Sequence, residues 1–244
     1  MKKKKIFKYS ILTIVILLVV SLSGILIWTN NTYKPSEELL ELVQESDYIK
    51  EGDFYVFEPK DKSNGKGIVM YPGALVEPLS YGYIASELSK QGYLVAIPDV
   101  NLNLSITENN KAEEFISNYS NKIQDWYVGG HSMGGVSATY FAEENQDIID
   151  GVILLGSYPA KSTDLSDNNQ IVLSIYAEND GLTTLDDVEE SKKNLPNDAI
   201  FAEIKGGNHA QFGMYGEQKG DNKAKISAKD QQDEIIKLIE TYIK

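Results

Sequence analysis

The stretch that decides the fold is WYVGGHSMGGVSATY, residues 126–140. Its first four residues suit a buried strand, a glycine-rich turn follows, and a helix-forming run comes directly after the turn. Ser132 lies at the apex of the turn with a glycine two places to either side. Such a turn strains the serine and exposes its hydroxyl at the sheet edge, and a Cβ on either glycine would collide with the neighbouring backbone. The stretch therefore predicts a serine nucleophile between a strand and a helix.

Around this stretch, apolar segments alternate with amphipathic ones. Several apolar segments are continuous, as expected of parallel strands that are covered on both faces. The alternation predicts a three-layer α/β domain with a mostly parallel central sheet and right-handed crossovers. We expect strands at 54–58, 67–71, 94–97, 126–129, 151–155, 171–177 and 199–204, and helices at 80–90, 111–123, 135–144, 185–194 and 228–243.

The composition excludes several classes of site. The 244 residues contain no cysteine, which rules out disulfides, thiolate metal sites and cysteine nucleophiles. The formal net charge is -13, and every positively charged side chain is a lysine. A strongly acidic chain without arginine is poorly suited to binding nucleic acid, so we expect no nucleic-acid partner. We also expect no cofactor.

The N-terminal region predicts a membrane anchor. A basic head at 1–8 precedes an apolar run at 9–28, which is long enough to span a bilayer. The lysines on its N-terminal side predict a cytoplasmic N-terminus and a domain outside the membrane. A cleaved signal peptide, with cleavage near Ser21–Ser23, is the alternative, and it would make the domain secreted. A linker and short helix at 29–52 would lead to a catalytic domain at 53–244.

A serine nucleophile needs a base, and the chain has only two histidines. His131 directly precedes Ser132, so its side chain should diverge from the serine hydroxyl and pack in the turn. His209 follows the last expected strand, in a glycine-rich loop. Elimination and position therefore predict His209 as the base.

The third member of the site should be a carboxylate that orients the histidine. Asp180 lies just past the expected strand 171–177, between the serine and the histidine in the chain. This gives the order Ser, Asp, His that is typical of α/β-hydrolases. Glu178 and Asp164 also follow strands and remain rival candidates.

The negative oxygen of a tetrahedral intermediate needs two backbone N–H donors. One donor should be Met133, the residue after the nucleophile, and the other should come from the loop after an earlier strand. That loop contains Gly73, Ala74 and Leu75. Either Ala74 or Leu75 could supply the second amide.

Four groups of residues carry a resemblance to a known family. The chain resembles the α/β-hydrolase superfamily, and more narrowly it is similar to small, membrane-anchored or exported bacterial hydrolases of the dienelactone-hydrolase-like type. The resemblance covers Asp53 to the C-terminus and implies a nucleophile, an acid and a base at Ser132, Asp180 and His209. Dienelactone hydrolases proper use a cysteine, which this chain lacks. The matching residues are 71–73, 130–135, 179–181 and 207–213.

The segment between the strand after the nucleophile and the strand before the acid bears on substrate size. Residues 156–170 are mostly polar and too few to build a lid, which predicts a shallow, open pocket. We expect a hydrolase of small esters or thioesters. A peptidase or acyltransferase with the same three residues, a non-catalytic surface-tethered binding protein and an anionic scaffold partner of a membrane complex remain alternatives.

Overall fold

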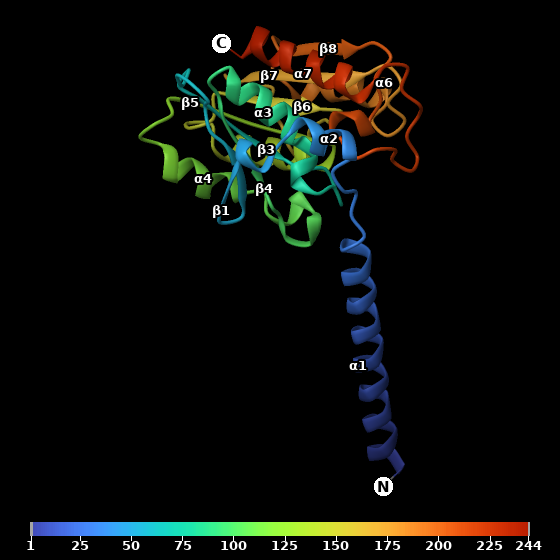
Figure 1. Cartoon of the computed structure of the whole chain (residues 1–244). Coiled ribbons are helices and arrows are strands. Elements are labelled where there is room, and N and C mark those ends of the chain that lie inside the picture. The colour runs from blue at the N-terminus through green and yellow to red at the C-terminus, as the bar shows by residue number, and fades with distance from the viewer. Residues whose placement is uncertain (1, 244) are drawn as a thin grey trace.

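A single sheet of eight strands organises the protein. The computed structural model describes residues 2–243, and the strands in the sheet follow the order β1-β2-β4-β3-β5-β6-β7-β8 (Figure 1). Strands β3 to β8 run parallel to one another, so their carboxyl ends meet at one edge of the sheet. The strands are β1 (Ile49–Glu51), β2 (Phe54–Phe57), β3 (Lys66–Tyr71), β4 (Leu94–Pro98), β5 (Asp125–His131), β6 (Gly151–Leu155), β7 (Ile171–Ala177) and β8 (Ile200–Ile204).

All seven expected strands form, and one more was missed. Strand β1 pairs antiparallel with β2, which pairs antiparallel with β4 at the edge of the sheet. The missed strand has the sequence Ile-Lys-Glu, and its side chains are exposed or half-buried. A short edge strand without apolar alternation gives no periodic signal, because only its backbone pairing holds it.

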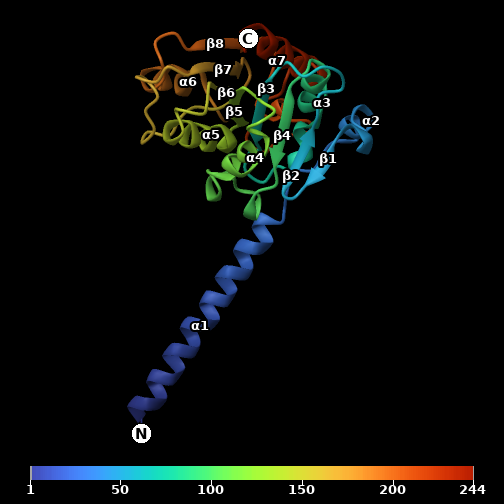
Figure 2. The same ribbon diagram turned by 90° about the vertical axis from the view of Figure 1, so that its left-hand side faces the viewer.

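Side chains from the strands alternate between two apolar cores, one on each face of the sheet. On β3, Ile68 and Met70 join the first core, whereas Val69 and Tyr71 join the second. Helices α2 (Glu37–Leu42), α3 (Gly82–Lys90) and α7 (Ala228–Tyr242) cover the first core, and α4 (Lys111–Tyr119) and α5 (Met133–Glu144) cover the second (Figure 2). Helix α6 (Leu185–Ser191) follows β7. The predicted three-layer α/β fold is confirmed.

The N-terminal segment forms a helix, α1 (Lys2–Thr29), which extends away from the domain (Figure 1). A hydrocarbon core of about 30 Å requires about 20 apolar residues in one helix. Within the part of the chain that the structure describes, no helix is long and apolar enough to cross a membrane. The prediction of a transmembrane anchor at 9–28, and of the membrane as a partner, is therefore not supported.

The segment after α1 is anchored to the domain and is not a free linker. Tyr33 forms a parallel bridge with Val76: its N–H donates to the Leu75 carbonyl at 2.7 Å, and its carbonyl accepts from the Glu77 N–H at 2.9 Å. Its ring packs on Tyr215, with 5.4 Å between the ring centroids. We call residues 30–34 the N-terminal arm. The arm thus lies against the loop after β3, the same loop that carries Ala74.

Candidate active site

Ser132 occupies the turn between β5 and α5 in a strained conformation. Its φ is 52° and its ψ is -120°, a region that costs a non-glycine residue about 1–3 kcal/mol. Besides the first bonds of α5, two hydrogen bonds tie its backbone to the end of β6 and the residues just after it. The Ser132 N–H donates to the Leu155 carbonyl at 3.1 Å, and the Ser157 hydroxyl donates to the Ser132 carbonyl at 2.6 Å. The surrounding sheet therefore maintains the strain at the serine.

The glycines around Ser132 are required by close backbone contacts, as the sequence predicts. A Cβ on Gly130 would lie 2.4 Å from the carbonyl carbon of Gly134. A Cβ on Gly134 would lie 2.2 Å from the Tyr71 carbonyl oxygen, on the neighbouring strand. Helix α5 can therefore begin directly under β3 only because these positions lack side chains.

His209 and Asp180 form a buried pair. His209 Nδ1 lies 2.8 Å from Asp180 Oδ2, and each side chain is 1 % exposed. The other carboxylate oxygen accepts hydrogen bonds from the N–H groups of Leu182 at 2.8 Å and Thr183 at 2.6 Å. These bonds fix the carboxylate, and the carboxylate in turn fixes the plane of the His209 ring.

The rival carboxylates lie elsewhere. Glu178 Oε2 accepts from the Gly206 N–H at 2.8 Å, and its other oxygen faces Lys225. These contacts lower the pKa of the Glu178 carboxyl, first through the Gly206 N–H and then through the Lys225 charge. Asp164 accepts from the Ser166 N–H in an exposed turn. Of the three candidates, only Asp180 contacts His209.

His209 Nε2 is buried and has no hydrogen-bond partner among the described residues. The His209 ring lies 4.4 Å, between centroids, from the ring of His131, which directly precedes Ser132. The structure records no hydrogen bond between Nε2 and the Ser132 hydroxyl. Such bonds are often long without substrate and tighten in the reacting complex.

Hydrogen bonding in the loop after β3 distinguishes Ala74 from Leu75 as the candidate second oxyanion donor. The Leu75 N–H donates to the Asn103 carbonyl at 2.8 Å, which favours Ala74 over Leu75 as the second donor. The N–H groups of Ala74 and Met133 have no recorded partner in the described chain. Sequence could not separate Ala74 from Leu75, because the partner of Leu75 comes from the loop after β4.

His131 packs in the turn as expected, and it also makes a polar contact that the sequence did not reveal. Its Nδ1 lies 2.9 Å from the Tyr81 hydroxyl, and both side chains are buried. Burial, and next the adjacent His209, hold the pKa of His131 well below its ordinary value of 6.5. His131 is therefore a neutral imidazole at the pH values at which most hydrolases work.

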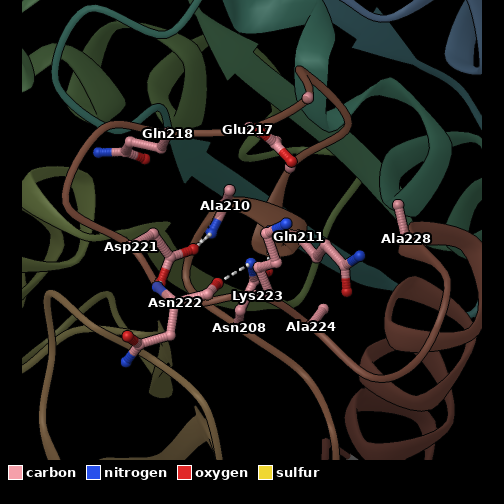
Figure 3. Close-up of a pocket in the computed structure, with 12 residues that line it drawn as sticks. Asn208, Ala210, Gln211, Glu217, Gln218, Asp221, Asn222, Lys223, Ala224 and Ala228 are labelled. Carbon is pink, nitrogen blue, oxygen red and sulfur yellow. Dashed lines mark hydrogen bonds between the residues drawn. The ribbon is translucent and has the colours of Figure 1, made fainter.

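Asp221 ties the loop that carries Asp180 to the loop that carries His209. Its Oδ1 accepts from the Gly181 N–H at 2.9 Å, and its Oδ2 accepts from the Ala210 N–H at 2.8 Å (Figure 3). Gly181 follows Asp180, and Ala210 follows His209. Nothing in the sequence marks Asp221, because it lies in a polar loop whose contacts are all tertiary.

A polar cavity of about 380 Å³ lies beside the base loop (Figure 3). Its lining includes Asn208 and Ala210, which flank His209 in the chain, together with Gln211 and Asp221. Neither Ser132 nor His209 is among its lining residues. The cavity is therefore adjacent to the candidate active site but separate from it.

Comparison with known proteins decides the family. The model of the alpha/beta hydrolase family matches residues 67–233, more than half of the chain.

The chain belongs to the alpha/beta hydrolase family.

Solved structures agree with this α/β-hydrolase assignment. A predicted CIB-like hydrolase from Thermoplasma acidophilum is 17 % identical, with a TM-score of 0.58 over 80 % of this chain and 96 % of the other. An alpha/beta hydrolase enzyme from the metagenome of sediments of the lagoon of Mar Chica, Morocco, is 20 % identical, with a TM-score of 0.61 over 80 % of this chain and 97 % of the other. At these identities the likeness shows the fold. No relative was found among curated proteins.

Family membership supports a hydrolytic enzyme with a small-molecule substrate. It does not extend to dienelactone-type specificity, the narrower resemblance drawn from the sequence.

Proposed function

We propose that this α/β-hydrolase is a serine hydrolase that cleaves small ester or thioester substrates through an acyl-enzyme on Ser132. One observation carries the proposal. The buried Asp180–His209 pair, with 2.8 Å between Oδ2 and Nδ1, leaves Nε2 of the histidine unpartnered beside the turn that holds Ser132.

Each group has a defined role in the proposed reaction. His209 Nε2 takes the proton of the Ser132 hydroxyl as its oxygen attacks the carbonyl carbon of the substrate. Asp180 stabilises the imidazolium that forms, because the Nδ1–H group donates a hydrogen bond to its carboxylate. The carbonyl oxygen becomes negative and accepts hydrogen bonds from the Met133 and Ala74 N–H groups.

The intermediate then collapses and the cycle closes. The bond from carbon to the leaving oxygen or sulfur breaks, and His209 Nε2 donates its proton to the leaving group. Water attacks the acyl-enzyme, again with its proton passing to Nε2. The acid product leaves, and Ser132 regains its proton from His209.

The connection between β6 and β7 supports small substrates. Residues 156–170 contain no helix or strand, so this connection forms no cap over the sheet edge. A site without a cap offers little apolar surface to a long acyl chain. Short acyl groups are therefore the substrates that this site fits best.

The test is labelling with a fluorophosphonate probe, which phosphonylates activated serines. The native protein should react, whereas Ser132→Ala should not, and His209→Ala should react much more slowly because the hydroxyl keeps its proton. A folded native protein that takes no label would refute the proposal that the protein is a serine hydrolase and would favour a binding protein. Equal labelling of Ser132→Ala would refute the nucleophile.

Turnover assays then separate the uses of the same three residues. We expect hydrolysis of p-nitrophenyl acetate and of an acetyl thioester, and no cleavage of matched peptide anilides. Faster consumption of the ester on adding an alcohol, with the ester of that alcohol as product, would instead indicate an acyltransferase.

A further inference from the structure

We propose that Tyr81 is a positioning residue for the oxyanion hole, because it holds the loop that presents the Ala74 N–H. In this arrangement His131 orients the Tyr81 hydroxyl. The inference rests on the proposed function. It gives Tyr81 and His131 roles that the sequence motifs do not assign to them.

The Tyr81 hydroxyl lies between two partners. It is 2.9 Å from the Gly73 nitrogen and 2.9 Å from His131 Nδ1, and the Tyr81 side chain is fully buried. Because a backbone N–H can only donate, the hydroxyl oxygen accepts from Gly73. The hydroxyl proton is then free for only one of the two contacts, the one to His131 Nδ1.

This chain of donors requires a particular form of His131. We assign Nδ1 as the acceptor of the Tyr81 proton, so the neutral ring carries its proton on Nε2, which is buried without a hydrogen-bond partner among the described residues. Burial supports this arrangement on both sides, because it lowers the pKa of His131 and raises the pKa of the Tyr81 hydroxyl. Both groups therefore stay uncharged, as the assigned hydrogen bond requires.

The hydrogen bond from Gly73 fixes one side of Ala74, and a second bond fixes the other side. The Leu75 N–H donates to the Asn103 carbonyl at 2.8 Å. Of the three consecutive amides in this loop, only that of Ala74 is left without a recorded partner in the described structure. The flanking amides are thus used to hold the loop, and the middle amide remains available to an oxyanion.

The packing around Gly73 leaves little freedom for the loop to shift. A Cβ at this position would lie 2.9 Å from His131 Nδ1 and 3.1 Å from the Tyr81 hydroxyl oxygen. Without that hydroxyl, the buried Gly73 N–H would have no acceptor. An unpaired buried donor is costly, so the loop would turn to find another partner and the Ala74 N–H would lose its aim.

The experiment compares Tyr81→Phe, His131→Leu and His131→Asn in the full chain. Phenylalanine removes only the hydroxyl. Leucine removes the acceptor for the hydroxyl proton, whereas the asparagine carbonyl oxygen can replace Nδ1 as that acceptor. Tyr83→Phe is the matched control, because the Tyr83 hydroxyl donates to Asp233 on the surface, away from the site.

Three quantities are measured for each variant: kcat and KM on p-nitrophenyl acetate, and the inhibition constant of an alkyl boronic acid. The boronic acid forms a tetrahedral adduct with the serine and places an oxygen in the oxyanion hole. We expect Tyr81→Phe and His131→Leu to lower kcat and weaken boronate binding by the same factor, about 10- to 100-fold, with KM within about twofold.

His131→Asn and Tyr83→Phe should behave like the native protein, and Tyr81→Phe combined with His131→Leu should be no worse than either change alone. The proposal is overturned if Tyr81→Phe keeps its kcat and its boronate affinity. It is also overturned if a well-folded His131→Asn variant loses as much kcat and boronate affinity as His131→Leu. A native protein that neither takes the fluorophosphonate label nor binds the boronate would refute the proposed function itself.

Discussion

At the scale of single residues, the proposed nucleophile is strained, whereas the proposed base and acid are not. Ser132 carries the unfavourable φ of 52°, whereas His209 and Asp180 are held by ordinary hydrogen bonds in loops. Among these three residues the strain falls on the one whose hydroxyl must protrude from the sheet edge, and Leu75 in the loop after β3 also has a positive φ, of 59°. Substitutions of the other two residues should therefore change catalysis with little effect on the fold.

Asp180→Asn tests the acid. The amide keeps the shape of the side chain but removes the charge that stabilises the imidazolium, so we expect kcat to fall about 10³- to 10⁴-fold with the fold retained. Glu178→Gln is the matched control, two residues away at the end of the same strand, and it should change kcat less than threefold or so. The kinetics of both variants on p-nitrophenyl acetate decide the assignment; a loss in Glu178→Gln alone would reverse it.

The buried His131 leads to a prediction about how the free energy of unfolding changes at acidic pH. Its pKa is lowered in the folded state, so below the ordinary value of 6.5 the unfolded chain binds one more proton than the folded one at this residue. Stability contributed by the neutral histidine is present above pH 6.5 and is lost as the pH falls, by up to about 1.4 kcal/mol per pH unit.

Urea unfolding at several pH values measures this loss, with His131→Asn as the reference because asparagine does not titrate. The difference in unfolding free energy between the two proteins should shrink steadily as the pH falls from 6.5 to 5. A difference that stays constant over this range would mean that the folded His131 titrates normally. His209 and Tyr81, which face His131, are present in both proteins.

At the scale of elements, the sequence specified the strands better than the contacts between loops. Parallel strands such as β6 and β7 were placed with their exact bounds, because buried apolar runs leave a clear pattern. Helix α4 ends at Tyr119, before the expected end at 123, because Ser120 and Asn121 favour a turn. The Asp180–His209 pair was predictable because only one histidine was eligible.

The contacts that complete the site were not predictable, for a common reason. Tyr81, Asn103 and Asp221 act on residues that are distant in the chain, through backbone groups that any sequence possesses. Backbone donors and acceptors carry no signature of their partner. Only the folded arrangement of the loops shows which amide is occupied and which is free.

The N-terminal arm gives a prediction at the element scale. Deleting residues 1–34 removes both backbone hydrogen bonds that Tyr33 makes to the loop containing Ala74. We expect the free energy of unfolding to fall by about 1–3 kcal/mol and kcat to fall with it, because the loop loses one of its supports. Deleting residues 1–28 keeps the arm and serves as the control; equal urea unfolding curves and equal kcat for the two truncations would contradict a role for the arm.

At the scale of the whole molecule, one edge of the sheet carries the three loops of the proposed site. All strands that supply Ser132, Asp180 and His209 end at this edge, and the connection at 156–170 stays short. That connection therefore supplies no apolar cover that could open on contact with a lipid droplet. Under the proposed function, we expect substrate choice to depend on the length of the acyl chain.

A series of p-nitrophenyl esters tests this expectation. The value of kcat/KM should be highest for acetate and butanoate and should fall for decanoate and palmitate, because a site without a cap cannot bury a long chain. The rate should also rise smoothly through the solubility limit of the short esters. A sharp increase at that limit, or a preference for palmitate, would indicate a covering element that forms on binding.

The order of the strands also determines when activity can arise during folding. Ser132 follows β5 and His209 follows β8, and β6 and β7 lie between them in the sheet, each joined by a parallel pairing that spans many residues of chain. Pairings of this non-local kind form slowly. A chain with only half of the sheet assembled would already contain helices, yet its serine would have no base. Recovery of esterase activity after dilution from denaturant should thus lag behind recovery of the circular dichroism signal. The recovered activity would report only the molecules whose sheet is complete.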